Sequence, residues 1–203
     1  MYNAYAPCGM QTHHTRNVGH KLKIEMAKKI GILILVIFLS IILASVYGFL
    51  HNQISYSIST EYFTEFKFEQ FWSVKYTLDF PRMSAGLIGI ASTWWFGLLL
   101  GLIIGIVGMF QQNYKIMWKS SIGAIIRTLG IAIGIGIVGI VVGKFIISNL
   151  DTNWNLPAEL NDRKSFLTAG TMHNFSYLGG IIGMIYGIIY QLKIKKASAQ
   201  HRV

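Results

Sequence analysis

The chain is poor in charged residues, above all acidic ones, and in cysteine and proline. Of its 203 residues 13% are charged, whereas an ordinary soluble domain has about 25%. There are 8 Asp and Glu against 18 Lys and Arg, with three prolines and one cysteine. The single cysteine excludes an intramolecular disulfide, and the low charge argues against a disordered chain and most soluble enzymes.

Apolar residues and glycine take the place of the missing charge. The chain is 53% hydrophobic and has 21 glycines. Four apolar stretches stand out, at about residues 30–50, 84–110, 122–147 and 174–192. Each has roughly the 20 residues that a helix needs to cross a ~30 Å hydrocarbon core, and backbone in lipid must be hydrogen-bonded internally. The sequence therefore predicts an all-α integral membrane protein with four transmembrane helices, spanning residues 30–192.

The charges divide between the two sides of this topology. Segments 1–29, 111–127 and 193–203 hold 12 basic residues and one acid, whereas the other side holds six basic residues, counting Lys144 near the end of the third span, and seven acidic residues. Basic loops stay in the cytoplasm, so both termini are predicted to be cytoplasmic. The net charge of +10 then reports topology, and we expect a lipid bilayer rather than nucleic acid as partner. Segments 1–29 and 193–203 are predicted to be basic tails, the first of them disordered; cleavage of the first span as a signal peptide is the less favoured alternative.

Glycines recur four residues apart in three of the four predicted spans. They are Gly97, Gly101 and Gly105, then Gly130 and Gly134, then Gly179, Gly183 and Gly187. Residues four apart share a helix face, and small residues let helix backbones approach closely in lipid. We expect these faces to pack spans 2, 3 and 4 into a tight core, with the first span mostly facing lipid. The alternative is that they join subunits of a homo-oligomeric channel.

The segment after the first span has an alternating pattern. Between residues 53 and 69 aromatic and branched side chains alternate with polar ones, and Phe63 alone breaks the rule. Alternation of this kind favours an extended, β-like strand, which would pair with residues 72–78 or lie on the membrane surface.

Polar residues at the outer face form a candidate site. His51 closes the first predicted span, His173 opens the fourth, and Glu61 and Glu65 lie in the loop between spans 1 and 2. Two imidazoles and a carboxylate, His51, His173 and Glu61, are ligands that suit Zn²⁺ or another divalent metal, although their spacing matches no standard pattern. The alternatives are proton relay and simple interfacial histidines that cap helix ends, and the last is favoured.

A second candidate site lies deeper in the membrane. Thr93 and Trp94 fall well inside the second span, and Trp94 would need a partner for its indole N–H there. Ser176 and Tyr177 share a face of the fourth span with His173. We expect these side chains to form a polar, aromatic pocket between spans 2 and 4.

Several of these stretches resemble a group of small four-span bacterial membrane proteins with no assigned activity. The resemblance covers roughly residues 30–190 and rests on four stretches, which are Y-G-F-L-H-N-Q from Tyr47, E-Y-F-T from Glu61, T-W-W from Thr93 and H-N-F-S-Y from His173. Members often have Asp where this chain has Asn52, so one candidate carboxylate is missing here. The resemblance implies a multi-pass protein of the bacterial cytoplasmic membrane, but no reaction or ligand.

The sequence favours a non-enzymatic binding, assembly or transport-accessory module that acts through its outer face, alone or with another membrane protein. Two other functions stay open. One is a metal-dependent membrane enzyme, in which a metal-bound water would be the nucleophile. The other is the homo-oligomeric channel built on the glycine faces.

Overall fold

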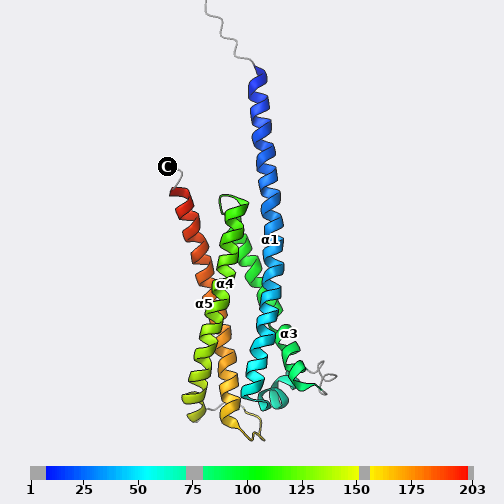
Figure 1. Cartoon of the computed structure of the whole chain (residues 1–203), viewed down its shortest axis with the longest axis vertical. Coiled ribbons are helices and arrows are strands. Elements are labelled where there is room, and N and C mark those ends of the chain that lie inside the picture. Colours follow the sequence, from blue (N-terminus) through cyan, green and yellow to red (C-terminus); the bar gives the residue numbers. More distant parts are fainter. Residues whose placement is uncertain (1–7, 72–79, 151–155, 201–203) are drawn as a thin grey trace, which may run out of the picture.

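The computed structural model describes residues 8–71, 80–150 and 156–200. No strand occurs within these ranges. The helices, drawn in Figure 1, are α1 (Cys8–Ile58), the π-helix η1 (Phe63–Lys67), α2 (Phe68–Gln70), α3 (Pro81–Met109), α4 (Tyr114–Phe145), the 3-10 helix η3 (Ile147–Asn149) and α5 (Arg163–Gln200).

Four segments are long and apolar enough to cross a membrane, which confirms the predicted fold class. They are Val18–Ile58, Pro81–Met109, Tyr114–Asn149 and Arg163–Gln200. The shortest has 29 residues, which at 1.5 Å per residue gives about 44 Å, more than the hydrocarbon thickness. Each helix therefore continues past the span predicted from its apolar residues alone.

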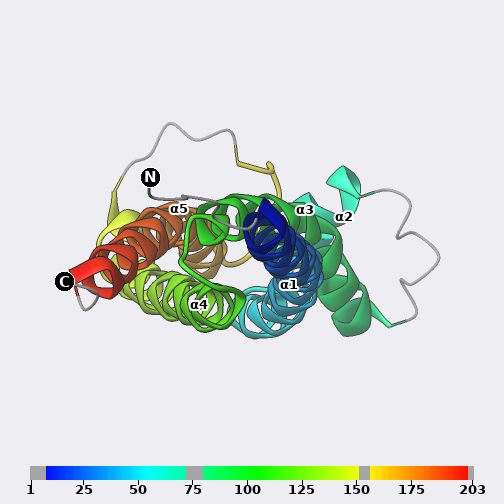
Figure 2. The same cartoon turned by 90° about the horizontal axis from the view of Figure 1, so that it is seen from above.

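The helices form two antiparallel pairs, α1 with α3 and α4 with α5, as Figures 1 and 2 show. The pairs meet each other along a narrower interface than the one inside each pair. We call the end of the bundle with the α3–α4 turn, residues 110–113, the turn end. The opposite end, where α1 ends and α5 begins, is the loop end. Helix α1 begins and α5 ends on the turn-end side of the bundle (Figure 1).

Glycine sets the closeness of packing in both pairs. A Cβ added to Gly97 would lie 2.6 Å from the Ser40 carbonyl oxygen on α1, and one added to Gly101 would lie 2.7 Å from Ile37 Cα. In the other pair, a Cβ on Gly183 would lie 2.8 Å from Thr128 Cα. Such contacts are too short for any side chain, so these backbones touch directly.

The expected tight core of spans 2, 3 and 4 is wrong for the partner of span 2, whereas the predicted glycine face of α5 (Gly179, Gly183 and Gly187) does pack on α4. The glycine face of α3, which includes Gly105, packs on α1. The large apolar side chains of the first span are nevertheless mostly exposed, as predicted, and its apolar window is only 11% buried. Gly130 and Gly134 on α4 have no described atom within 4 Å of where a Cβ would lie. Helix α4 instead meets α5 through other small residues, among them Gly139 and Gly143. The face of α3 that carries Gly97, Gly101 and Gly105 packs on α1, and α1 has small residues of its own at this contact.

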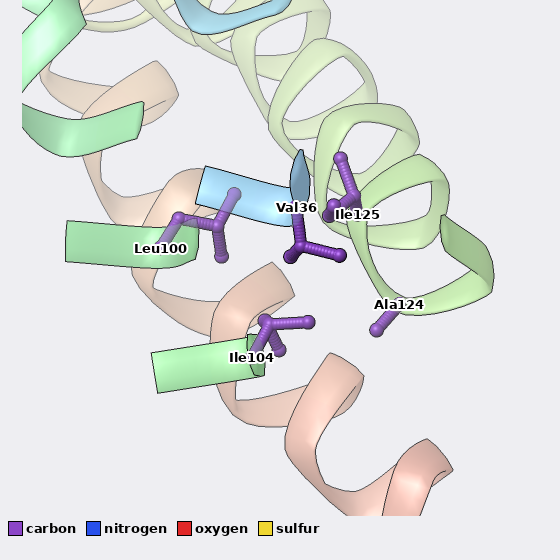
Figure 3. Packing of buried hydrophobic residues seen from close by; sticks show 5 residues of the cluster. All are labelled: Val36, Leu100, Ile104, Ala124 and Ile125. Carbon is purple, nitrogen blue, oxygen red and sulfur yellow. The ribbon is translucent and has the colours of Figure 1, made fainter. Parts of the chain in front are cut away.

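An apolar cluster fills the middle of the bundle where the two pairs meet. It consists of Val36 from α1, Leu100 and Ile104 from α3, and Ala124 and Ile125 from α4, shown in Figure 3. Val36, Ile104 and Ala124 are completely buried. We call these five residues the apolar core; they separate the polar groups near the loop end from those near the turn end.

The predicted extended strand is wrong for the residues that the structure describes. Residues 53–58 complete α1, and residues 63–70 form η1 and α2; the proposed pairing segment 72–78 lies outside the described residues. Phe63, the residue that breaks the alternation, is completely buried. It packs with Tyr62 and Phe166 in one cluster, an arrangement that a helical turn provides and a two-residue repeat does not.

The predicted disordered N-terminal tail is also wrong for residues 8–29, which belong to α1. The Glu25 carboxylate accepts a hydrogen bond from the backbone N–H of Tyr114, the first residue of α4. The Asn113 side chain accepts another from Ile116 at the same helix start. Carboxylate and amide oxygens satisfy free N–H groups at helix N-termini, so α1 is anchored to α4 here.

Candidate functional site

The two histidines of the predicted outer-face site lie against each other. His51 on α1 and His173 on α5 have ring centroids 4.6 Å apart and planes at 86°. Their side chains are 8% and 5% exposed, respectively. His51 lies about two helical turns before the end of α1 and His173 lies further than that from the start of α5, so neither caps a helix end. The structure thus brings together two predicted site residues that are far apart in the sequence.

Hydroxyl groups surround the histidine pair. His173 Nε2 lies 3.0 Å from Ser55 Oγ, within hydrogen-bonding distance. His51 Nδ1 has two longer contacts, 3.4 Å to the Tyr47 hydroxyl and 3.5 Å to Ser176 Oγ. Among the described residues, His51 Nε2 has no hydrogen-bond partner. We call these five residues the histidine cluster; its polar groups around His51 are incompletely satisfied.

Aromatic rings cover this cluster at the loop end. The Tyr62 ring stacks on His173 at 5.0 Å between centroids, and Phe63 lies beside the same imidazole. The Lys67 ammonium lies over the Tyr62 and Phe66 rings. Burial raises the pKa of Tyr62 and lowers the pKa of Lys67. The π-helix η1, a geometry often found at functional sites, contains Phe63, Phe66 and Lys67, and Tyr62 is its N-cap residue.

Glu61 does not join the histidines. Its carboxylate accepts hydrogen bonds from the backbone N–H groups of Asn161 and Asp162, both at 2.8 Å. These bonds hold the pKa of Glu61 below its usual value. Within the described ranges, no group of three His, Cys, Asp or Glu side chains is placed to hold a metal ion. The predicted trio of metal ligands is therefore wrong in geometry, and Glu65 is exposed to solvent.

A cavity of about 70 Å³ lies between the histidine cluster and the apolar core, walled by all four long helices. Of the predicted intramembrane pocket, Thr93, Ser176 and Tyr177 line it, and Trp94 does not. The Trp94 side chain is 47% exposed and points away from the bundle. Tyr177 is 48% exposed as well as lining the cavity, so the cavity reaches the outer surface of the bundle beside it.

Most hydroxyls in the cavity wall are fully engaged. Ser40 donates to the Val36 carbonyl at 2.8 Å, and Thr93 donates to the Ala44 carbonyl at 2.8 Å. Thr128 donates to backbone carbonyls of its own helix and of α5. Tyr47 and Ser176, which line the cavity and also belong to the histidine cluster, are hydrogen-bonded to each other and make long contacts to His51. The cavity is thus apolar apart from one end that offers polar groups.

A second buried polar cluster, which sequence reasoning missed, lies at the turn end. The Lys29 ammonium donates to the backbone carbonyls of Met109 and Gln111, the Gln111 amide donates to the Gln191 carbonyl, and the Gln191 amide donates to Ser121. We call Lys29, Gln111, Ser121 and Gln191 the lysine–glutamine cluster. The sequence feature that could have predicted this cluster is Gln191, an amide side chain within an apolar stretch. The Gln191 side chain is completely buried.

The four apolar helices are those of a multi-pass membrane protein, and a mostly apolar cavity lies between them. No protein-family model, curated protein or solved structure matches the chain. The site geometry alone therefore carries the functional argument. The channel alternative stays a prediction, because the structure contains a single chain.

Proposed function

We propose that this chain is a non-enzymatic binding module of the bacterial cytoplasmic membrane. It takes a small apolar molecule from the lipid phase into the cavity between its four helices. The observation that carries the proposal is the cavity of about 70 Å³ whose wall includes Leu43, Phe96 and Leu129 and reaches the surface at Tyr177.

Three features support binding over chemistry or conduction. The apolar core lies across the middle of the bundle, which favours a closed binding space over a pore through one chain. The histidine cluster has no carboxylate to orient or activate an imidazole among its five residues. The cavity wall offers apolar contacts, which are what holds ligands in preformed pockets.

The orientation that we propose places the loop end outside and both termini in the cytoplasm, as the distribution of basic residues predicts. Cys8 gives a direct test because it is the only cysteine of the chain. A membrane-impermeant maleimide should label it in inverted membrane vesicles and leave it unlabelled in intact spheroplasts, with Cys8→Ser as the blank. Labelling in intact spheroplasts would overturn the orientation and leave the cavity argument unchanged.

Binding is tested with radiolabelled decane and the purified chain in vesicles of phosphatidylethanolamine and phosphatidylglycerol. Wild type should bind decane saturably, at about one molecule per chain above protein-free vesicles. Ala132→Leu adds three carbons at a cavity-lining residue and should abolish this binding. Ile133→Leu is the matched control, since Ile133 is 43% exposed and does not line the cavity. Absence of saturable binding by wild type would overturn the proposal.

A further inference from the structure

Arg127 lies on the outer surface of α4, within a segment that is otherwise apolar. Its guanidinium stacks on the Tyr190 ring of α5, 3.8 Å from the ring centre, and donates to the Gly123 carbonyl at 2.9 Å. These two contacts hold the guanidinium in place, while the side chain as a whole stays exposed. A guanidinium has five N–H groups, and among the described residues only Gly123 accepts a hydrogen bond from this one. Donors are therefore left over on the surface that lipid touches.

The Arg127 guanidinium lies near the level of the lipid phosphates. Because it bonds the carbonyl one turn earlier in α4, the side chain is directed toward the turn end. At 1.5 Å per residue, the helix from Gly123 to Lys144 is about 30 Å long. This length matches the ~30 Å hydrocarbon core of a bilayer, which places the guanidinium where hydrocarbon gives way to headgroups.

The two helices that surround this guanidinium offer it no anion. Neither Tyr114–Phe145 nor Arg163–Gln200 contains an Asp or Glu. Lys119 is exposed and lies two turns nearer the turn end on the same face of α4 as Arg127. Gly123, between them, has no side chain to separate the two charges. This face therefore presents two cations to the lipid without a carboxylate from either helix.

Beyond Arg127, toward the middle of the membrane, the same face of α4 is open. Gly130 and Gly134 follow Arg127 by three and seven residues and so share its face. A Cβ added to either glycine would meet no described atom within 4 Å. A hydrocarbon chain can therefore lie directly against the α4 backbone at these positions, next to the cations.

We propose that this face of α4 docks one anionic phospholipid from the leaflet at the turn end. The phosphate binds Arg127, whose planar fork of donors matches two phosphate oxygens, and an acyl chain lies along Gly130 and Gly134. Lys119 favours a headgroup with a net negative charge, because the ammonium of a zwitterionic lipid would lie beside a like charge. The site is separate from the cavity between the helices, which Arg127 does not line.

Native mass spectrometry of the purified chain in detergent micelles counts bound lipids one by one. Phosphatidylglycerol should bind at one site about tenfold more tightly than phosphatidylethanolamine. Arg127→Gln should weaken phosphatidylglycerol binding about tenfold, because a charged hydrogen-bonded pair is lost. The matched control Lys195→Gln removes the same charge at the same end, over the Phe110 ring, and should leave the affinity unchanged. Equal losses in both variants, or equal binding of the two lipids by wild type, would overturn the site.

Gly134→Leu tests the acyl-chain part of the site without changing a charge. The space beside Gly134 is open, so the variant should fold with the helix content of wild type, measured by circular dichroism. It should weaken phosphatidylglycerol binding several-fold, because the leucine occupies the place of the chain. Ala91→Leu, at an exposed residue of α3, is the control and should have no effect. Dimers that Gly134→Leu disrupts, with no lipid preference in wild type, would assign the face to a second copy and overturn the proposal.

Discussion

The bundle has two buried polar clusters, one on each side of the apolar core, and they are built differently. In the lysine–glutamine cluster most donors reach backbone carbonyls, which join α1, the α3–α4 turn and α5. In the histidine cluster the polar contacts of the two imidazoles join side chains to side chains, and those of His51 are long. The cavity between the four helices adjoins the second cluster. The difference indicates that the turn end is a structural clamp and the loop end is the part available to a ligand.

The largest expected effect on stability concerns the close contact between α4 and α5 at Gly183. Gly183→Val should lower the free energy of unfolding by about 3 kcal/mol, because its Cβ would lie 2.8 Å from Thr128 backbone atoms. Gly130→Val is the control and should change it by less than about 0.5 kcal/mol, since the space beside Gly130 is open. Unfolding by SDS in mixed micelles measures the stability of both variants. Equal losses of unfolding free energy would contradict the close α4–α5 contact at Gly183.

The clamp is tested by Lys29→Met, which should cost about 2 kcal/mol. The substitution leaves two carbonyls of the α3–α4 turn without their ammonium donor, and buried unpaired acceptors are destabilising. Decane binding at saturation should stay at the wild-type level. The control Lys28→Met removes an exposed ammonium over the Tyr114 ring and should cost less than about 1 kcal/mol. If Lys29→Met abolished decane binding with little loss of stability, the lysine–glutamine cluster would serve binding instead of structure, and the account would be contradicted.

Substitutions in the histidine cluster should lower the free energy of unfolding less than Lys29→Met does. His51→Phe should lower the unfolding free energy by less than about 1 kcal/mol, because the contacts that it removes are long and weak. We expect His173→Phe to cost about 1 kcal/mol, through loss of the 3.0 Å contact to Ser55. A stability loss for His51→Phe as large as that for Lys29→Met would remove the distinction between the clusters.

The smallest expected effect is the pH dependence of the Glu61 contact with the start of α5. The folded-state pKa of Glu61 is lowered, so its stabilising contribution is present above pH 4.5 and is lost as the pH falls through the folded value. Asp162, whose pKa is also lowered by hydrogen bonds from Ser165, titrates in the same range. Glu61→Gln should therefore reduce, without abolishing, the fall in unfolding midpoint between pH 6 and pH 3. Glu65→Gln is the matched control, and identical slopes for wild type and Glu61→Gln would contradict the contact.

The four membrane-spanning helices and the similar depth of the two histidines followed from the sequence, because both depend on distance along apolar helices; the direct contact of the two rings did not. Apolar length fixes where a helix crosses, and helices that end on the same side bring their terminal residues to the same level. The prediction for Trp94 was wrong because its helix face depends on which neighbour packs against α3. The prediction for Glu61 was wrong because free backbone N–H groups at the start of α5 compete for the carboxylate.

The packing of α1 against α3 could have been predicted from small residues other than glycine on α1. Ser40, Ala44 and Gly48 lie four residues apart and face the glycines of α3. Serine and alanine allow close backbone approach almost as well as glycine. The lysine–glutamine cluster was less accessible to prediction, because Lys29 lies in a run of basic residues typical of a solvated helix end. Only the turn carbonyls, which have no sequence signature, explain its burial.

An experimental structure determined under xenon pressure tests the central comparison most directly. Xenon enters dry apolar cavities and leaves closed polar clusters empty. The account predicts xenon in the cavity between Phe96, Leu129 and Ser176, and none beside Gln111 and Gln191. Xenon at the turn end, or an empty cavity in a crystal that holds xenon elsewhere, would contradict it.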